Sequence, residues 1–311
     1  MNTQCLNSLE VDAVALSPLQ LPITQLGDSM RTKIATLIED EKYAALPQLL
    51  HGADIRMIRY ASKQLATSLQ EGDDDFLEHI AGLLANPSSD SHHLACQLIP
   101  HASKAQRKKA VAFLPQLIES EDWTVRDAAC EVAGRLLRKD FSRMIGVLET
   151  WRSQGSVNLY RAIAIAAIRA ADSTHLERAE PLLRLLEPLL SEGEPIVRRN
   201  LGPAAIGMHL LAHYPSYTFE YLVKWSTSND AQTLWNVAMA FSAPAAVPIA
   251  KKALIVLRKL SLDERRFVWR AAASSMWKLG RKRPDLIRPE LARWLEDERR
   301  VNVAREAIKH L

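Results

Sequence analysis

The sequence contains few of the residues that build sheets or span membranes. Aromatic residues make up only 6% of its 311 positions, and glycine occurs only 11 times. Strands favour aromatic and β-branched residues, whereas helices favour the Ala and Leu that recur throughout this chain, so the composition predicts packed helices. The sequence has no run of 18 apolar residues, and we therefore expect no membrane-spanning helix.

Cysteine and the common cofactor motifs are also scarce. Cys5, Cys96 and Cys130 are scattered without a CxxC pair, which is typical of small buried side chains in a cytosolic protein and not of disulfides or zinc ligands. His209 and His213 have the spacing of two metal ligands, but no third ligand is evident near them, and no glycine-rich phosphate loop occurs. We therefore expect no metal and no other cofactor.

The N-terminus has no basic region followed by an apolar run, so no signal peptide is expected. Together with the cysteine usage, this predicts a cytoplasmic protein, placed in the bacterial cytosol or nucleoid, without membrane contact. The chain is also expected to be a monomer, because a solenoid with capped ends needs no partner subunit.

Charge is distributed unevenly along the chain. Residues 1–100 carry 6 Lys and Arg against 13 Asp and Glu, whereas residues 251–311 carry 17 against 8. A gradient of this kind indicates either that the C-terminal part contacts an anionic partner or that both ends are solvated surfaces.

A short pattern recurs along the sequence: an aliphatic residue, a basic or aromatic residue, a polar residue and usually Ala. Its copies start at residues 58, 92, 125, 159, 197, 234, 268 and 303, so that their spacing stays between 33 and 38 residues. This period predicts an all-α fold, an α-solenoid of about eight HEAT-like helical repeats that form an ARM/HEAT superhelix. Residues 1–30 do not match and are expected to be an N-terminal arm or cap, and residues 31–311 a single solenoid.

Equivalent positions of successive repeats should line up on the concave face of the solenoid. The third position of the pattern predicts a row formed by Tyr60, Leu94, Asp127, Arg161, Arg199, Asn236, Arg270 and Arg305. The second position adds Arg126, Tyr160, Arg198, Trp235 and Trp269. A basic concave face with interleaved aromatic rings is suited to a nucleic-acid backbone. Alternatively, single arginines in this helix serve only hydrogen bonds between repeats.

Asp127 is the one carboxylate in this row. Trp123 precedes it by one helical turn, which places the indole and the carboxylate on one helix face, and Arg161 holds the equivalent position one repeat later. A Trp–Asp–Arg cluster is therefore predicted on the concave surface. The alternative is an inter-repeat carboxylate paired with Arg126 or Arg161, beside a half-buried aromatic residue.

At these residues the sequence resembles the AlkD-like family of HEAT-repeat alkylpurine DNA glycosylases. The resemblance covers about 115–165, the predicted catalytic repeats, and again 265–311, with Gly134 and Trp151 as supporting matches. The chain departs from the family in carrying about two additional repeats. It also has Met208 and Ser274 where the family has an aromatic residue, which leaves the shape of the lesion site open.

The resemblance implies a DNA repair enzyme that hydrolyses the N-glycosidic bond of cationic N3- or N7-alkylated purines in double-stranded DNA. Asp127 would stabilise the oxocarbenium-like sugar and orient a water molecule, Trp123 would lie against the cationic deoxyribose, and Arg161 would hold the flanking phosphate. Whether bulky adducts are accepted stays open. A non-catalytic HEAT-repeat protein that binds structured DNA or a protein partner is the main alternative, and a scaffold or lyase-like protein is a third.

Overall fold

The structure, a computed structural model, describes residues 23–69 and 75–311. Every regular element in these ranges is a helix, which confirms the predicted all-α class. None of these helices is long and apolar enough to cross a membrane. Cys5 and most of the predicted N-terminal arm lie outside the described residues.

One series of helices begins anew every 34 to 38 residues, and each member packs against the next. We call these the inner helices. They are α3 (Ile55–Leu69), α5 (Ser89–Leu98), α8 (Trp123–Lys139), α10 (Val157–Ala170), α12 (Pro195–Arg199) with the π-helix η5 (Asn200–Leu210), α15 (Ala231–Ala240), α17 (Arg266–Gly280) and α19 (Val301–Ile308).

A second series, the outer helices, alternates with the first along the chain. It contains α4 (Asp75–Ala85), α6 (Arg107–Val111), α7 (Leu114–Ile118), α9 (Phe141–Arg152), α11 (Ala179–Leu186), α14 (Pro215–Trp225), α16 (Ala250–Leu260) and α18 (Pro284–Leu295). The chain begins with α1 (Ile23–Glu39) and α2 (Leu46–Leu49), and the short α13 (Leu211–His213) continues η5.

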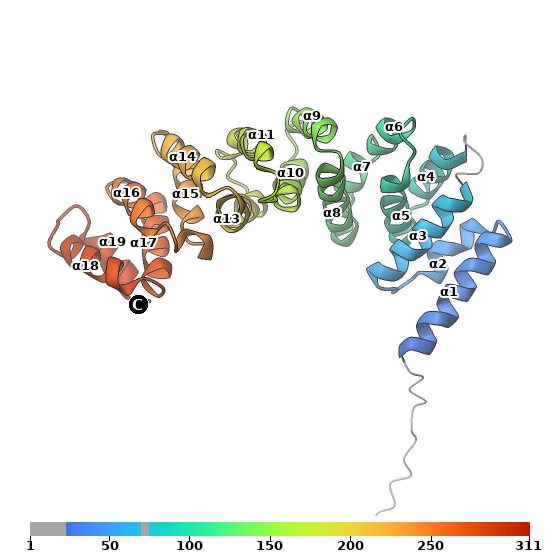
Figure 1. Ribbon diagram of the computed structural model, residues 1–311, viewed down its shortest axis with the longest axis horizontal. Coiled ribbons are helices and arrows are strands. Elements are labelled where there is room, and N and C mark those ends of the chain that lie inside the picture. The colour runs from blue at the N-terminus through green and yellow to red at the C-terminus, as the bar shows by residue number, and fades with distance from the viewer. Residues whose placement is uncertain (1–22, 70–74) are drawn as a thin grey trace, which may run out of the picture.

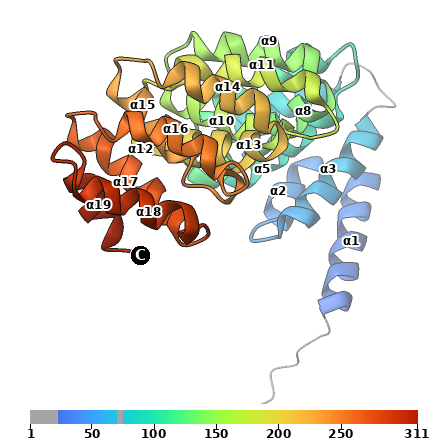
Figure 2. The ribbon, with the colours of Figure 1, turned by 60° about the vertical axis from the view of Figure 1, so that its left-hand side comes forward.

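The two series form an arch. Helices α8, α10, α15 and α17 lie on its concave side, and α9, α11, α14 and α16 lie on the convex side (Figure 1). A view from a second direction shows α9, α11 and α14 following one another along one side of the arch (Figure 2). The arrangement is consistent with a helical solenoid, in which each helix pair buries its apolar stripe against its neighbours.

Apolar side chains of both series form the core between them. Trp151, Trp225 and Trp294 are 3%, 4% and 3% exposed, in agreement with their predicted place in the core. Cys96 and Cys130 are buried free cysteines, as expected, and burial raises the pKa of the Cys130 thiol to about 12.

Glycine permits close contact between two pairs of inner helices. A Cβ at Gly134 of α8 would lie 2.7 Å from both Cβ and Cγ of Arg169 on α10. A Cβ at Gly207 of η5 would lie 2.5 Å from the Ala240 carbonyl oxygen of α15. The approach at Gly134 fixes the spacing of α8 and α10, which carry the candidate site.

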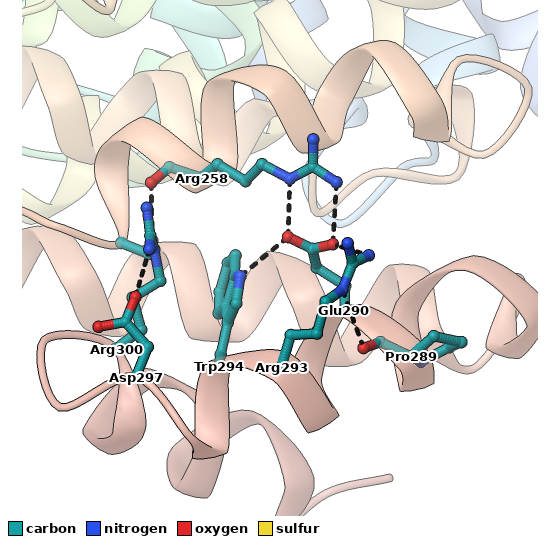
Figure 3. Close-up of polar contacts among 8 residues, drawn as sticks. Arg258, Pro289, Glu290, Arg293, Trp294, Asp297 and Arg300 are labelled. Atoms are coloured by element: carbon teal, nitrogen blue, oxygen red, sulfur yellow. Dashed lines mark hydrogen bonds and ion pairs between the residues drawn. The ribbon is translucent and has the colours of Figure 1, made fainter.

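A buried carboxylate links the outer helices α16 and α18 (Figure 3). The side chain of Glu290 is 5% exposed and accepts hydrogen bonds from Arg258 Nε at 2.7 Å and Nη2 at 2.8 Å. It also accepts one from Trp294 Nε1 at 2.9 Å and one from Arg293 Nη2 at 2.5 Å. Because all these donors favour the ionised form, with Arg258 contributing most, the pKa of Glu290 is lowered.

Candidate functional site

The first turn of α8 is held in place by its own cap. Asp122 precedes the helix and accepts hydrogen bonds from the Thr124 amide at 2.8 Å and the Thr124 hydroxyl at 2.7 Å. Hydrogen bonds from the Ser89 side chain and from Thr124 lower the pKa of Asp122 to about 2. Arg126 donates from Nη1 to the carbonyl oxygens of Ser120 at 2.6 Å and Glu121 at 2.8 Å, which fixes the loop that enters α8.

Trp123 is the first residue of α8, and its side chain projects into solvent. It is 64% exposed, whereas the other six tryptophans of the chain are buried or half-buried. Its ring is therefore accessible to a ligand, and Trp combines a large apolar face with a polar N–H group.

Asp127 follows Trp123 by one turn and contacts Arg161 of α10. Arg161 Nη2 donates to Asp127 Oδ1, and Arg161 Nη1 lies 3.8 Å from Cys130 Sγ. The Arg161 side chain is 14% exposed and that of Asp127 is 46% exposed. The structure therefore brings Asp127 and Arg161 into direct contact, with the exposed Trp123 on the same face of α8.

Similar ion pairs recur between inner helices. Arg169 of α10 pairs with Glu131 of α8 at 2.6 Å, and Arg270 of α17 pairs with Glu306 of α19 at 3.0 Å. The Asp127–Arg161 pair thus also ties α8 to α10, in addition to any role in chemistry.

The predicted row of third pattern positions is interrupted in the structure. Leu94 and Asn236 are fully buried, and Asn236 donates from Nδ2 to the Leu190 carbonyl oxygen at 2.8 Å and accepts from the Gly202 amide at 3.1 Å. In α3, α5 and α15 the third position of the pattern is the sixth residue of the helix, whereas in the other inner helices it is the fifth. Neighbouring side chains of a helix point in directions about 100° apart. A shift by one position therefore places Leu94 and Asn236 in the core and not at the surface.

A continuous row appears when residues are counted from the start of each inner helix. None of the fifth residues is buried, and we call them the fifth-position row: Arg59, His93, Asp127, Arg161, Arg199, Trp235, Arg270 and Arg305. Arg59 and His93 hold the second position of the sequence pattern, but the predicted rows did not include them; counting from the helix starts identifies both.

The remaining predicted DNA contacts differ in exposure. Arg199 and Arg305 are exposed, whereas Tyr160 and Trp269 are half-buried and packed against the core. Arg198 lies over the rings of Trp235 at 4.9 Å and Phe267 at 5.4 Å, measured from Cζ to the ring centroids. Phe267 was not singled out from the sequence, because it lies one residue before the recurring pattern.

The parts of the chain that the structure describes contain no group of three or more His, Cys, Asp or Glu side chains that could hold a metal ion. The candidate site consists of side chains of α8 and α10.

Comparison with known proteins identifies the family. Residues 39–208 match the family model of DNA alkylation repair enzymes, and this range includes Trp123, Asp127 and Arg161. The C-terminal block of the resemblance, residues 265–311, lies beyond the match. A search of curated proteins found no match. Since the matched range covers more than half of the chain, the protein belongs to the DNA alkylation repair enzyme family, in agreement with its resemblance to the AlkD-like proteins.

Proposed function

We propose that the protein is a monofunctional DNA glycosylase that releases N3- or N7-alkylated purines from double-stranded DNA. The observation that supports this most directly is the half-exposed Asp127 carboxylate beside the exposed ring of Trp123, within the residues that match the family.

The chemistry suits these side chains. An N3- or N7-alkylated purine carries a positive charge and leaves as a neutral base, so its departure needs no general acid. The bond to the base breaks, its electron pair stays with the base, and an oxocarbenium-like sugar is left. Asp127 stabilises this cation and accepts a proton from the water that attacks the anomeric carbon, and Trp123 supplies a cation–π contact to the sugar. The products are the free base and an abasic site.

The geometry favours a positioning role for Arg161. Its guanidinium is largely buried and already engaged by Asp127 Oδ1, so that it orients the carboxylate. Among the described residues, no hydrogen bond is recorded to the second oxygen, Oδ2, so this oxygen is available to a water molecule. Phosphate contacts then come from exposed members of the fifth-position row, such as Arg199 and Arg305.

The proposed DNA path follows the inner helices. In this proposal about eight HEAT-like repeats form the superhelix, and its basic concave face carries the duplex from Arg59 to Arg305. The protein acts as a monomer and needs no metal or other cofactor. Trp269 and Tyr160 are packed against the core beneath this face, and Arg126 stabilises the loop before Trp123.

Replacement of one side-chain atom tests the proposed chemistry. We expect Asp127→Asn to lower the rate of base release from N7-methylguanine DNA by at least 100-fold while DNA binding is retained, because the anion is lost and the shape is kept. Glu131→Gln is the matched control, since Glu131 lies one turn later on α8 and pairs with Arg169 of α10. Equal base release by wild type and Asp127→Asn would refute the catalytic role of Asp127.

A non-catalytic DNA-binding protein is the second candidate. It is favoured by the recurrence of ion pairs between inner helices, which makes the Asp127–Arg161 pair one structural link among several. Absence of base release by the wild type on small and bulky adducts, with steeply salt-dependent DNA binding, would support this alternative.

A further inference from the structure

A second candidate binding site lies along the fifth-position row, on α15 and α17. An open cavity of about 580 Å³ is lined by Trp235, Met239, Arg266, Phe267, Arg270, Ala271 and Ser274. It is separated from Asp127 by the intervening inner helices α10 and α12 with η5. It is therefore distinct from the proposed site of base release.

Two aromatic rings form one wall of this cavity. The rings of Trp235 and Phe267 are nearly parallel, with 14° between their planes and 5.8 Å between their centroids. Arg198 contacts both rings but does not line the cavity, so it supports them from a different side. This arrangement orients the two rings before any ligand binds.

The other lining residues define the chemistry of a ligand. Met239 and Ala271 supply apolar surface, and Ser274, a small residue, stands where the resemblance predicts an aromatic one. Arg266 is exposed, and no ion pair or hydrogen bond of its side chain is recorded among the described residues, whereas Arg270 is paired with Glu306. None of the described residues that line the cavity carries a carboxylate. A flat, apolar group that carries a nearby negative charge fits these walls.

We propose that this cavity binds an unpaired nucleobase of DNA, stacked on Trp235 and Phe267, with the adjoining phosphate on Arg266. Stacking on aromatic rings next to arginine is the common way in which proteins hold unpaired bases, and it tolerates any base because each has a flat face. The inference rests on the proposed contact of the fifth-position row with DNA. It adds a place for single-stranded or distorted DNA away from Asp127.

Binding of two labelled strands of equal length tests the proposal. One is oligodeoxythymidylate and the other is an abasic strand with the same phosphates. We expect the wild type to bind the base-bearing strand more tightly. Phe267→Ala should lower that affinity by roughly 5- to 100-fold and leave the affinity for the abasic strand nearly unchanged. Phe267→Tyr should retain the preference, because it keeps the ring.

Two further variants separate stacking from charge and from folding. Arg266→Gln should weaken both strands alike, because it removes a phosphate contact. Tyr217→Ala is the matched control, since Tyr217 is a 44% exposed aromatic residue on the outer helix α14, and we expect no effect on either strand. Thermal unfolding checks that each variant is folded.

Equal binding of both strands by the wild type, or equal losses for both strands with Phe267→Ala, would overturn the stacking site. Base release by the wild type and by Asp127→Asn, measured in parallel on alkylated duplex, reports on the proposed glycosylase activity separately. A wild type that shows no preference for the base-bearing strand but keeps Asp127-dependent release would reject the cavity alone. Absence of release with an intact preference would reject the glycosylase alone.

Discussion

Trp123 and Asp127 occupy successive turns of α8 but experience different surroundings. Asp127 is oriented by Arg161, whereas the Trp123 side chain is 64% exposed and no ring contact with it is recorded among the described residues. An aromatic ring that packs against little in the folded protein contributes little to its stability. Its substitution can therefore separate a functional role from a structural one.

Trp123→Ala should reduce the rate of base release by roughly 5- to 30-fold, because the cation–π contact to the sugar is lost. Its melting temperature should stay close to that of the wild type. Ile255→Ala is the control, since Ile255 is a 62% exposed apolar residue on the outer helix α16. Single-turnover kinetics and thermal unfolding provide the two measurements. A large loss of stability in Trp123→Ala without a loss of rate would contradict the proposed role.

At the scale of the helix, the sequence predicted the elements better than their rotation. The period of the pattern located every inner helix, since packing of successive repeats needs an apolar stripe at a fixed spacing. It did not give the rotation of α3, α5 and α15, because the shift of one residue depends on where each helix begins. Similarly, nothing in the local sequence shows that Phe267 stacks on Trp235, because that contact joins two repeats.

Close packing of η5 against α15 leads to a prediction about stability. Gly207→Ala should destabilise the protein by about 2 kcal/mol, because the added Cβ would lie 2.5 Å from the Ala240 carbonyl oxygen and the backbone would have to move. In Gly146→Ala the Cβ meets nothing within 4 Å on the outer helix α9. That control should be neutral or up to about 1 kcal/mol more stable, because Ala favours helix. Urea unfolding measures both, and equal effects would contradict the tight contact.

The link between α16 and α18 should make stability depend on pH. The pKa of Glu290 is lower in the folded protein than its ordinary value of 4.5, so the ionised carboxylate stabilises the fold at neutral pH. This stabilisation decreases as the pH falls below about 4.5 towards the lowered pKa, because the unfolded state then binds the proton more readily. Glu290→Gln should cost about 3 kcal/mol at pH 7 and weaken this pH dependence.

Asp285→Asn is the control for this prediction. Asp285 also lies on α18, but it is 59% exposed and pairs with Arg283 at the surface, so we expect its replacement to change the stability little. Urea unfolding between pH 7 and about pH 3 compares the three proteins, since the expected loss lies below pH 4.5. The same pH dependence in the wild type and Glu290→Gln would show that Glu290 does not carry the effect.

Across the whole molecule, positive charge follows the inner helices from one end of the arch to the other. The net charge of the sequence changes sign between residues 1–100 and 251–311, which left open whether the C-terminal part contacts an anionic partner or both ends are solvated surfaces. The fifth-position row adds a further observation, because Arg59 on α3 is exposed as Arg305 on α19 is, although α3 belongs to the acidic part of the chain. Only the folded arrangement shows which charges share a surface.

Replacing the two ends of the row therefore measures how far DNA extends along the arch. Arg59→Gln and Arg305→Gln should each reduce the slope of log affinity against log salt concentration by about 1 for undamaged duplex DNA, because each removes one phosphate contact. Lys251→Gln, on the outer helix α16, should leave the slope unchanged, since Lys251 is exposed on the convex side. A reduced slope for Arg305→Gln alone would limit the duplex to the basic C-terminal part. An unchanged slope for both variants would refute binding along the row, because exposed arginines that contact phosphates must displace counterions.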